Sequence, residues 1–70
     1  MMPITFADIG EEAIIKRIGG RAATKRHLEN LGFVVGEQVT VLNAINGNLI
    51  IKVKESRIAI SQEMAQKIMI

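Results

Sequence analysis

The Asn46-Gly47 pair constrains the fold more than any other feature of the sequence, because it separates two apolar runs of alternating pattern. Both central residues of a type I′ turn need a positive φ, and asparagine followed by glycine meets this need well. The pair therefore predicts a β-hairpin with a two-residue loop. Closing the hairpin on this loop pairs Ile45 with Asn48, Asn43 with Ile50, and Val41 with Lys52.

Capping residues predict where the helices begin and end. Thr5 and Asp8 have the spacing of a capping box, which opens a helix of one turn. A longer helix is predicted from Arg21 to Leu31, where alanine and leucine favour the helix and Gly32 follows as the C′ residue. Ser61 is expected to cap a further short helix near the end of the chain.

Short apolar runs predict the strands. We expect about five, at residues 13–18, from residue 37, at residues 49–54, 57–60 and 69–70, with a tight turn at Glu55-Ser56. Strands of this length and spacing are typical of a small β-barrel, whose closure removes the unpaired sheet edges that invite aggregation. The sequence thus predicts a single domain over residues 1–70, mainly β with short helices, in which the helix after the first strand covers one end of the barrel.

Side chains that carry catalysis or bind metals are scarce and scattered. There is no cysteine, His27 is the one histidine, and no spacing of the carboxylates gathers a set of metal ligands. Gly19-Gly20 precedes a helix but lacks the lysine of a phosphate-binding Walker A loop. Ser56 and Ser61 occupy a turn and a helix cap, where serine has a structural role. We therefore expect no enzymatic activity, no cofactor and no metal site built by one chain, while a weak site shared within an oligomer is left open.

The distribution of apolar residues indicates where the chain resides. No stretch of about 18 apolar residues is present, so the sequence predicts no insertion into a membrane. The first residues lack the basic region and apolar stretch of a secretion signal. The absence of cysteine agrees with a reducing cytosol.

Basic side chains gather in two groups, and the only aromatic residues, Phe6 and Phe33, lie outside both. Charge runs are mostly solvated, and an acidic protein partner is the main alternative. Small barrels bind nucleic acid chiefly by stacking bases on aromatic side chains, so nucleic acid is a disfavoured partner here. The larger group is Lys16, Arg17, Arg21, Lys25 and Arg26, and the smaller one is Lys52, Lys54 and Arg57.

The chain carries more apolar side chains than one face of each strand requires. Leu49-Ile50-Ile51 and Val41-Leu42 supply apolar residues to both faces of their strands, and Phe33-Val34-Val35 adds an apolar run in a predicted loop. Two explanations stay open at this point. Either the helices cover the second face, or an apolar patch is exposed, and exposed patches mark contacts with other proteins.

The segment from Lys25 to Val41 resembles the FeoA family. The family pattern has a basic residue before leucine, then leucine-glycine-aromatic or aliphatic, a second glycine, and an alternating strand. Val35 departs from it, since many members have proline before the second glycine. The residues that carry the resemblance are Arg26, Leu28, Leu31, Gly32, Phe33, Gly36, Val39 and Val41.

The resemblance implies an SH3-like barrel and a small cytoplasmic accessory protein of ferrous iron uptake. Its expected partner is FeoB, a membrane transporter with a cytosolic GTP-binding domain, which it would bind and modulate by protein contact. No catalytic residue is carried over. The alternatives are a nucleic-acid-binding barrel and an SH3-like regulatory or dimerisation module of the kind found in metal-dependent repressors.

For the partner-binding surface we expect contributions from the predicted helix and the loop that follows it. The helical spacing of Leu28 and Leu31 favours a core position for both over a contact with a partner. Whether the protein forms a homo-oligomer is left open by the sequence. The expected apolar contacts are Leu28, Leu31, Phe33 and Val35, and the expected charged rim is Arg21, Lys25 and Arg26.

Overall fold

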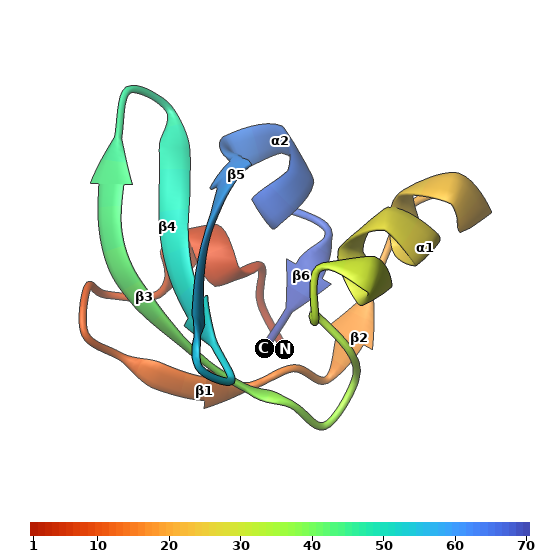
Figure 1. Cartoon of the computed structure of the whole chain (residues 1–70), viewed down its shortest axis with the longest axis horizontal. Coiled ribbons are helices and arrows are strands. Elements are labelled where there is room, and N and C mark those ends of the chain that lie inside the picture. Colours follow the sequence, from red (N-terminus) through yellow and green to blue (C-terminus); the bar gives the residue numbers. More distant parts are fainter.

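The backbone forms six short strands, two α-helices and one 3-10 helix, in a computed structural model that describes all residues from 1 to 70. Antiparallel pairing joins β1, β3, β4 and β5, in that order, into one sheet and β2 with β6 into a second. Both α-helices lie on the same side of the four-stranded sheet (Figure 1), so its other face is open to solvent. In chain order the elements are η1 (Ile4–Phe6), β1 (Glu12–Ile14), β2 (Arg17–Ile18), α1 (Ala22–Asn30), β3 (Gln38–Ile45), β4 (Asn48–Val53), β5 (Ser56–Ser61), α2 (Gln62–Ala65) and β6 (Ile68–Met69).

The prediction of a mainly β fold with short helices is confirmed, but the predicted closure of the barrel is wrong. The segment predicted as one strand from residue 13 to 18 is split into β1 and β2, which belong to different sheets. The Ile15 N–H donates to Glu37 O at 3.0 Å, and the next N–H, that of Lys16, donates to Met69 O at 2.8 Å. Because neighbouring residues of an extended chain point their N–H groups to opposite sides, the segment changes partner here from β3 to β6.

The hairpin is the most accurately predicted element. Asn46 and Gly47 have φ values of 49° and 80°, and the pairs Ile45–Asn48 and Asn43–Ile50 are as predicted. Val41 pairs with Ile51 rather than with Lys52, because the register shifts between Val41 and Asn43. The extra residue there is Leu42, so a β-bulge accounts for the two consecutive apolar residues, and it keeps Val41 and Ile51 together in the core.

The second turn is also displaced by one residue from its prediction. Val53 pairs with Ser56, so the turn residues are Lys54 and Glu55 rather than Glu55 and Ser56. Lys54 takes a φ of 57°, which is uncommon for a residue with a side chain. This register keeps Ile51 opposite Ile58, and both belong to the apolar side of the sheet.

Helix capping agrees with the sequence at the last helix and differs at the first. The Met64 N–H donates to Ser61 Oγ at 3.2 Å, so Ser61 caps α2 as predicted. The capping box at Thr5 and Asp8 is wrong, because η1 begins after Pro3 and has no side-chain cap. Instead, the Asp8 N–H donates to Glu11 Oε1 at 3.0 Å.

A core of 14 buried apolar residues, with no buried polar residue, fills the space between the two sheets and the helices. The apolar surplus noted in the sequence is partly buried and partly exposed. Leu42 and Ile50 are partly buried. Phe6, Ile9 and Val35, in contrast, are each more than 60% exposed.

Candidate functional site

The end of α1 is fixed by a Schellman motif, which sets the course of the loop that follows. The Gly32 N–H donates to Glu29 O and the Phe33 N–H donates to Leu28 O, each at 2.9 Å. Gly32 has a φ of 105°, as a C′ residue in this motif requires. The motif brings Phe33 onto Leu28, and neither side chain has any exposed surface. The chain therefore leaves the helix with one aromatic side chain anchored in the core.

A tight turn follows at once and carries the most exposed apolar residue of this region. The Glu37 N–H donates to Val34 O at 3.1 Å and Gly36 has a φ of 92°, which is the pattern of a type II turn. Val35 occupies the second position of the turn, where proline is common in such turns, and it is 63% exposed. The Gly36 N–H donates to Ile15 O at 2.8 Å, so the turn is tied to the strand segment beside it.

A groove lies between this turn, the outer side of α1 and the segment around β2. Ile18, Val34 and Val35 provide its apolar part, and its charged lining is one carboxylate, that of Glu29, with three cationic side chains. We call this the basic groove. Its lining residues are Lys16, Arg17, Ile18, Lys25, Glu29, Val34 and Val35.

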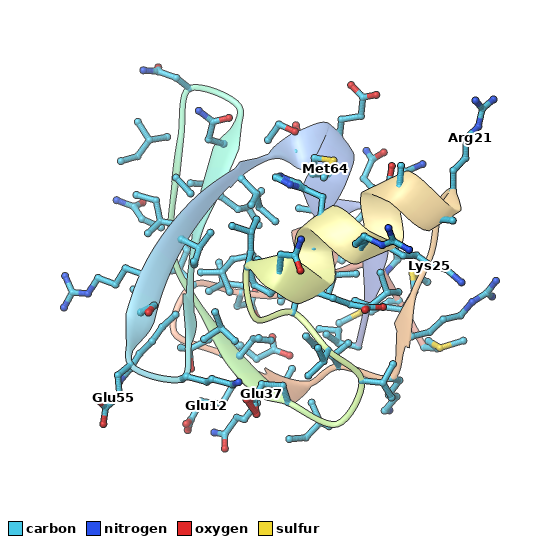
Figure 2. All side chains as sticks on the ribbon, turned by 45° about the vertical axis from the view of Figure 1, so that its right-hand side comes forward. Glu12, Arg21, Lys25, Glu37, Glu55 and Met64 are labelled. Carbon is cyan, nitrogen blue, oxygen red and sulfur yellow. The ribbon has the colours of Figure 1, made fainter.

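The predicted rim residues are all exposed, but they do not form one cluster. Lys25 lines the basic groove, whereas Arg21 and Arg26 do not. Figure 2 shows Arg21 extending away from the protein at the first turn of α1, with Lys25 further along the same helix. Lys25 is therefore the rim residue whose position fits a contact made at Val35.

Two of the predicted apolar contacts need correction. Leu28 and Phe33 are fully buried, so neither can touch a partner while the domain stays folded. Leu31 is partly buried and packs against the core. The physical reason is the Schellman motif, which turns the first residue after Gly32 inward and the following ones outward. Of the predicted apolar residues, Val35 is the one exposed in the groove.

Lys16, Arg17 and Val34 also line the groove, although they were not among the expected contact residues. The sequence held a partial signal for them. Lys16 and Arg17 belong to the larger basic group, and Val34 is part of the apolar run that includes Val35. The sequence could not show that the backbone changes its hydrogen-bond partner from β3 to β6 at Lys16, and this change brings Lys16 and Arg17 beside α1.

A second, polar pocket lies on the open face of the four-stranded sheet, across β1, β3 and β4. The Gln38 Nε2 donates to Glu12 Oε2 at 2.6 Å, and Lys54 Nζ lies 3.8 Å from Glu37 Oε1. Each of the two carboxylates thus has a neighbouring donor or cation. No group of three or more histidine, cysteine, aspartate or glutamate side chains lies close enough to hold a metal ion.

Comparison with known protein families decides the classification. The model of the FeoA domain matches residues 2–70. The chain belongs to the FeoA domain family. It is 39% identical to a protein of Methanocaldococcus jannaschii that carries the name Fe(2+) transport protein A, over 100% of this chain and 85% of the relative. The family expected from the sequence is therefore confirmed.

Solved structures agree with the family and define the fold. A crystal structure of an iron uptake regulatory protein, FeoA, superposes with a TM-score of 0.88 at 27% identity, covering 96% of this chain and 89% of the other. FeoA of Stenotrophomonas maltophilia in complex with zinc, described as a procaryotic SH3 domain protein, gives 0.84 at 23% identity over 99% and 88%. A manganese-dependent transcriptional repressor gives 0.86 at 16% identity, over 94% of this chain and 38% of the repressor. The SH3-like fold expected for this FeoA-family chain is thus confirmed.

The helices of this FeoA-family chain are short. None of them reaches the length and apolar character that crossing a bilayer requires.

Proposed function

We propose that this FeoA-family protein is an accessory protein of ferrous iron uptake that works in the cytoplasm without catalysing a reaction. It acts by binding and modulating a FeoB-type membrane transporter with a GTP-binding domain, and the basic groove makes the contact. The family membership and the name of the Methanocaldococcus jannaschii relative support the link to iron transport. The geometry of the basic groove supports the mode of action.

The observation that carries the proposal is the exposed Val35 beside a cluster of cations. An apolar side chain held on a tight turn loses little conformational freedom when it is covered by a partner. Lys16, Arg17 and Lys25 line the groove together with Val35, and Glu29 is its only carboxylate. The groove therefore favours a partner surface that carries acidic residues. Such a surface binds proteins by apolar contact and selects them by charge.

The nucleic-acid alternative receives less support from the same groove. None of its lining residues is aromatic, and Phe33, which follows α1, is fully buried. Single-stranded nucleic acid binds small barrels largely by stacking on exposed aromatic rings. The proposal therefore assigns the basic side chains to a protein partner.

The test is the affinity of the protein for the soluble GTP-binding domain of a FeoB-type transporter, measured by isothermal titration calorimetry. Replacing Val35 with aspartate places a charge at the centre of the contact, and we expect binding to weaken by about tenfold or more. The fold should survive, because Val35 is 63% exposed on a turn.

Ile9 provides a matched control for this substitution. It is 64% exposed, and it precedes Gly10 (φ 88°) in a turn closed by the Glu11 N–H and Asp8 O at 3.0 Å. Ile9→Asp therefore makes the same chemical change in the same kind of turn at a different place on the surface. Equal loss of binding in the two variants, or no loss in either, would count against the basic groove as the contact.

A further inference from the structure

The outer edge of β1 has backbone groups with no partner. β1 is the edge strand of its sheet, and only β3 pairs with it. The Val41 N–H donates to Glu11 O at 3.4 Å and the Ile15 N–H donates to Glu37 O at 3.0 Å, so Glu11 and Ile15 face β3. Because successive residues of an antiparallel strand point their polar groups to opposite sides, Glu12 and Ile14 face away from β3.

The next residue in this outward-facing series already has a strand beside it. The Lys16 N–H donates to Met69 O at 2.8 Å, which places the β6 segment along the same edge. The Met2 N–H donates to Ile70 O at 2.9 Å and the Ile70 N–H donates to Met2 O at 2.8 Å, so Met2 lies on the far side of that segment. At Lys16 the β6 segment lies against the outer edge of the strand, but beside Glu12 and Ile14 no strand occupies that edge.

An apolar groove occupies this position. Its apolar lining comes from Met1, Met2, Ala13, Ile14 and Ile70, and Ile14 is 48% exposed. Figure 1 shows the two ends of the chain side by side close to β1, which is the arrangement that gives the groove two walls. One wall is the free edge of β1 and the other is the segment that contains Met1 and Met2.

The shape and charge of this groove indicate what it can hold. A lone extended segment fits between two walls, whereas an edge strand of a second copy would bring its whole sheet against Met1 and Met2. The charged lining residues are Glu11, Glu12 and Lys16, so carboxylates outnumber cations. This balance favours a segment that is neutral or basic.

We propose that the groove beside β1 is a docking site for an extended segment of a partner protein, neutral or basic and apolar at alternate positions, which adds to the edge of β1 as a further strand. Addition of a strand to a free sheet edge is a common mode of peptide recognition, in which main-chain hydrogen bonds supply affinity and side-chain pockets supply specificity. The site is separate from Val34 and Val35, and it does not depend on the role proposed for the basic groove.

The experiment uses the full chain labelled with nitrogen-15 and the capped peptide acetyl-Thr-Val-Thr-Val-Lys-Val-Thr-amide. On titration we expect the amide signals of Glu12 and Ile14 to shift and their hydrogen exchange to slow by about tenfold, as new backbone hydrogen bonds protect them. The edge of β5 is an internal control. Val53 pairs with Ser56 next to the second turn, so Ser56 directs its backbone polar groups toward β4. Arg57 and Ala59 therefore direct theirs outward, as Glu12 and Ile14 do in β1, but no apolar groove lies beside them. Their signals should not change.

Two substitutions at one position separate the backbone contribution from that of the side chain. Glu12→Pro and Glu12→Ala both remove the carboxylate and its hydrogen bond from Gln38, but only proline also removes the outward N–H. Proline is tolerated on an edge strand when the lost N–H faces solvent. We expect the peptide to bind Glu12→Pro about fivefold or more weakly than Glu12→Ala.

A chemical change in the peptide gives a test that leaves the protein untouched. Two isomers are prepared, each with three N-methyl groups, one methylated on the backbone nitrogens of its second, fourth and sixth residues and the other on those of its third, fifth and seventh. Their affinities should differ by about tenfold or more because only one set of N–H groups faces β1. Equal affinity of both isomers would overturn the proposal. So would shifts confined to Val34 and Val35, tighter binding when glutamate replaces the lysine of the peptide, or slow exchange at Glu12 and Ile14 that depends on protein concentration alone.

Discussion

Replacement of Phe33 by alanine is the perturbation that most directly tests the place of the Schellman motif in this fold. Phe33 is the largest fully buried side chain, and its backbone N–H is bonded to Leu28 O at 2.9 Å. Truncation of a buried phenylalanine costs about 3–5 kcal/mol in free energy of unfolding. At about 0.05–0.15 kcal/mol per residue, a chain of 70 residues has a total of about 3.5–10 kcal/mol. The substitution should therefore remove a third or more of the stability, and in the lower part of this range all of it.

The assay is urea unfolding followed by circular dichroism, since the chain has no tryptophan or tyrosine to report by fluorescence. With a slope of about 1 kcal/mol per molar urea for so small a domain, the midpoint should fall by about 3 M or more. The control is Phe6→Ala. Phe6 is 70% exposed, so its truncation should cost less than about 1 kcal/mol. If the two variants lost similar stability, the assignment of Phe33 to the core and of Phe6 to the surface would be refuted.

Three smaller changes test other parts of the structure. Ser61→Ala removes the acceptor for the Met64 N–H at the start of α2 and should cost about 1 kcal/mol in the same unfolding assay, whereas an unchanged midpoint would show that the cap is dispensable. Gly32→Ala should cost about 1–2 kcal/mol through its φ of 105° alone, because the new Cβ would lie no closer than 3.6 Å to Val53, and rescue by Gly32→Asn relative to alanine is expected. Glu37→Gln should change the free energy of unfolding by less than about 0.5 kcal/mol, since its ion pair with Lys54 is long at 3.8 Å and the Lys54 side chain is 65% exposed, and a larger loss would mean that the pair matters more than its geometry indicates.

The elements that the sequence predicted well are those determined by adjacent residues. Asn46-Gly47 sets its own turn, Ser61 caps its own helix, and Gly32 ends α1, because each effect acts over a few positions of the chain. The strand pairs Ile45–Asn48 and Asn43–Ile50 followed directly from the position of this turn. The classification also followed, since the spacing of leucine, glycine and phenylalanine at the end of α1 is part of the family pattern.

The elements that were predicted wrongly depend on partners far away in the sequence. Nothing near Leu42 signals a bulge, which exists because Val41 and Ile51 both belong in the core. The division of the first strand at Ile15 and Lys16 is set by β3 on one side and β6 on the other. Local periodicity cannot report either, because both are decided when distant strands pack together.

The candidate site shows the same limit. A run of three apolar residues after a helix reads as an exposed patch, yet the first of them, Phe33, is drawn inward by the hydrogen bonds that end α1. Val35 lies at the surface, where the turn places it. The cations beside it come from another segment, and their place in the groove became visible only in three dimensions.

The pairing of β2 with β6 has a consequence for the order in which the molecule folds. β3, β4 and β5 are joined by two-residue turns, so they associate at a small cost in chain entropy. Arg17 meets Met69 only after nearly the whole polypeptide has been gathered in between. We therefore expect the three-stranded meander of β3, β4 and β5 to form early in folding. The small β2–β6 sheet should form last and separate first during unfolding.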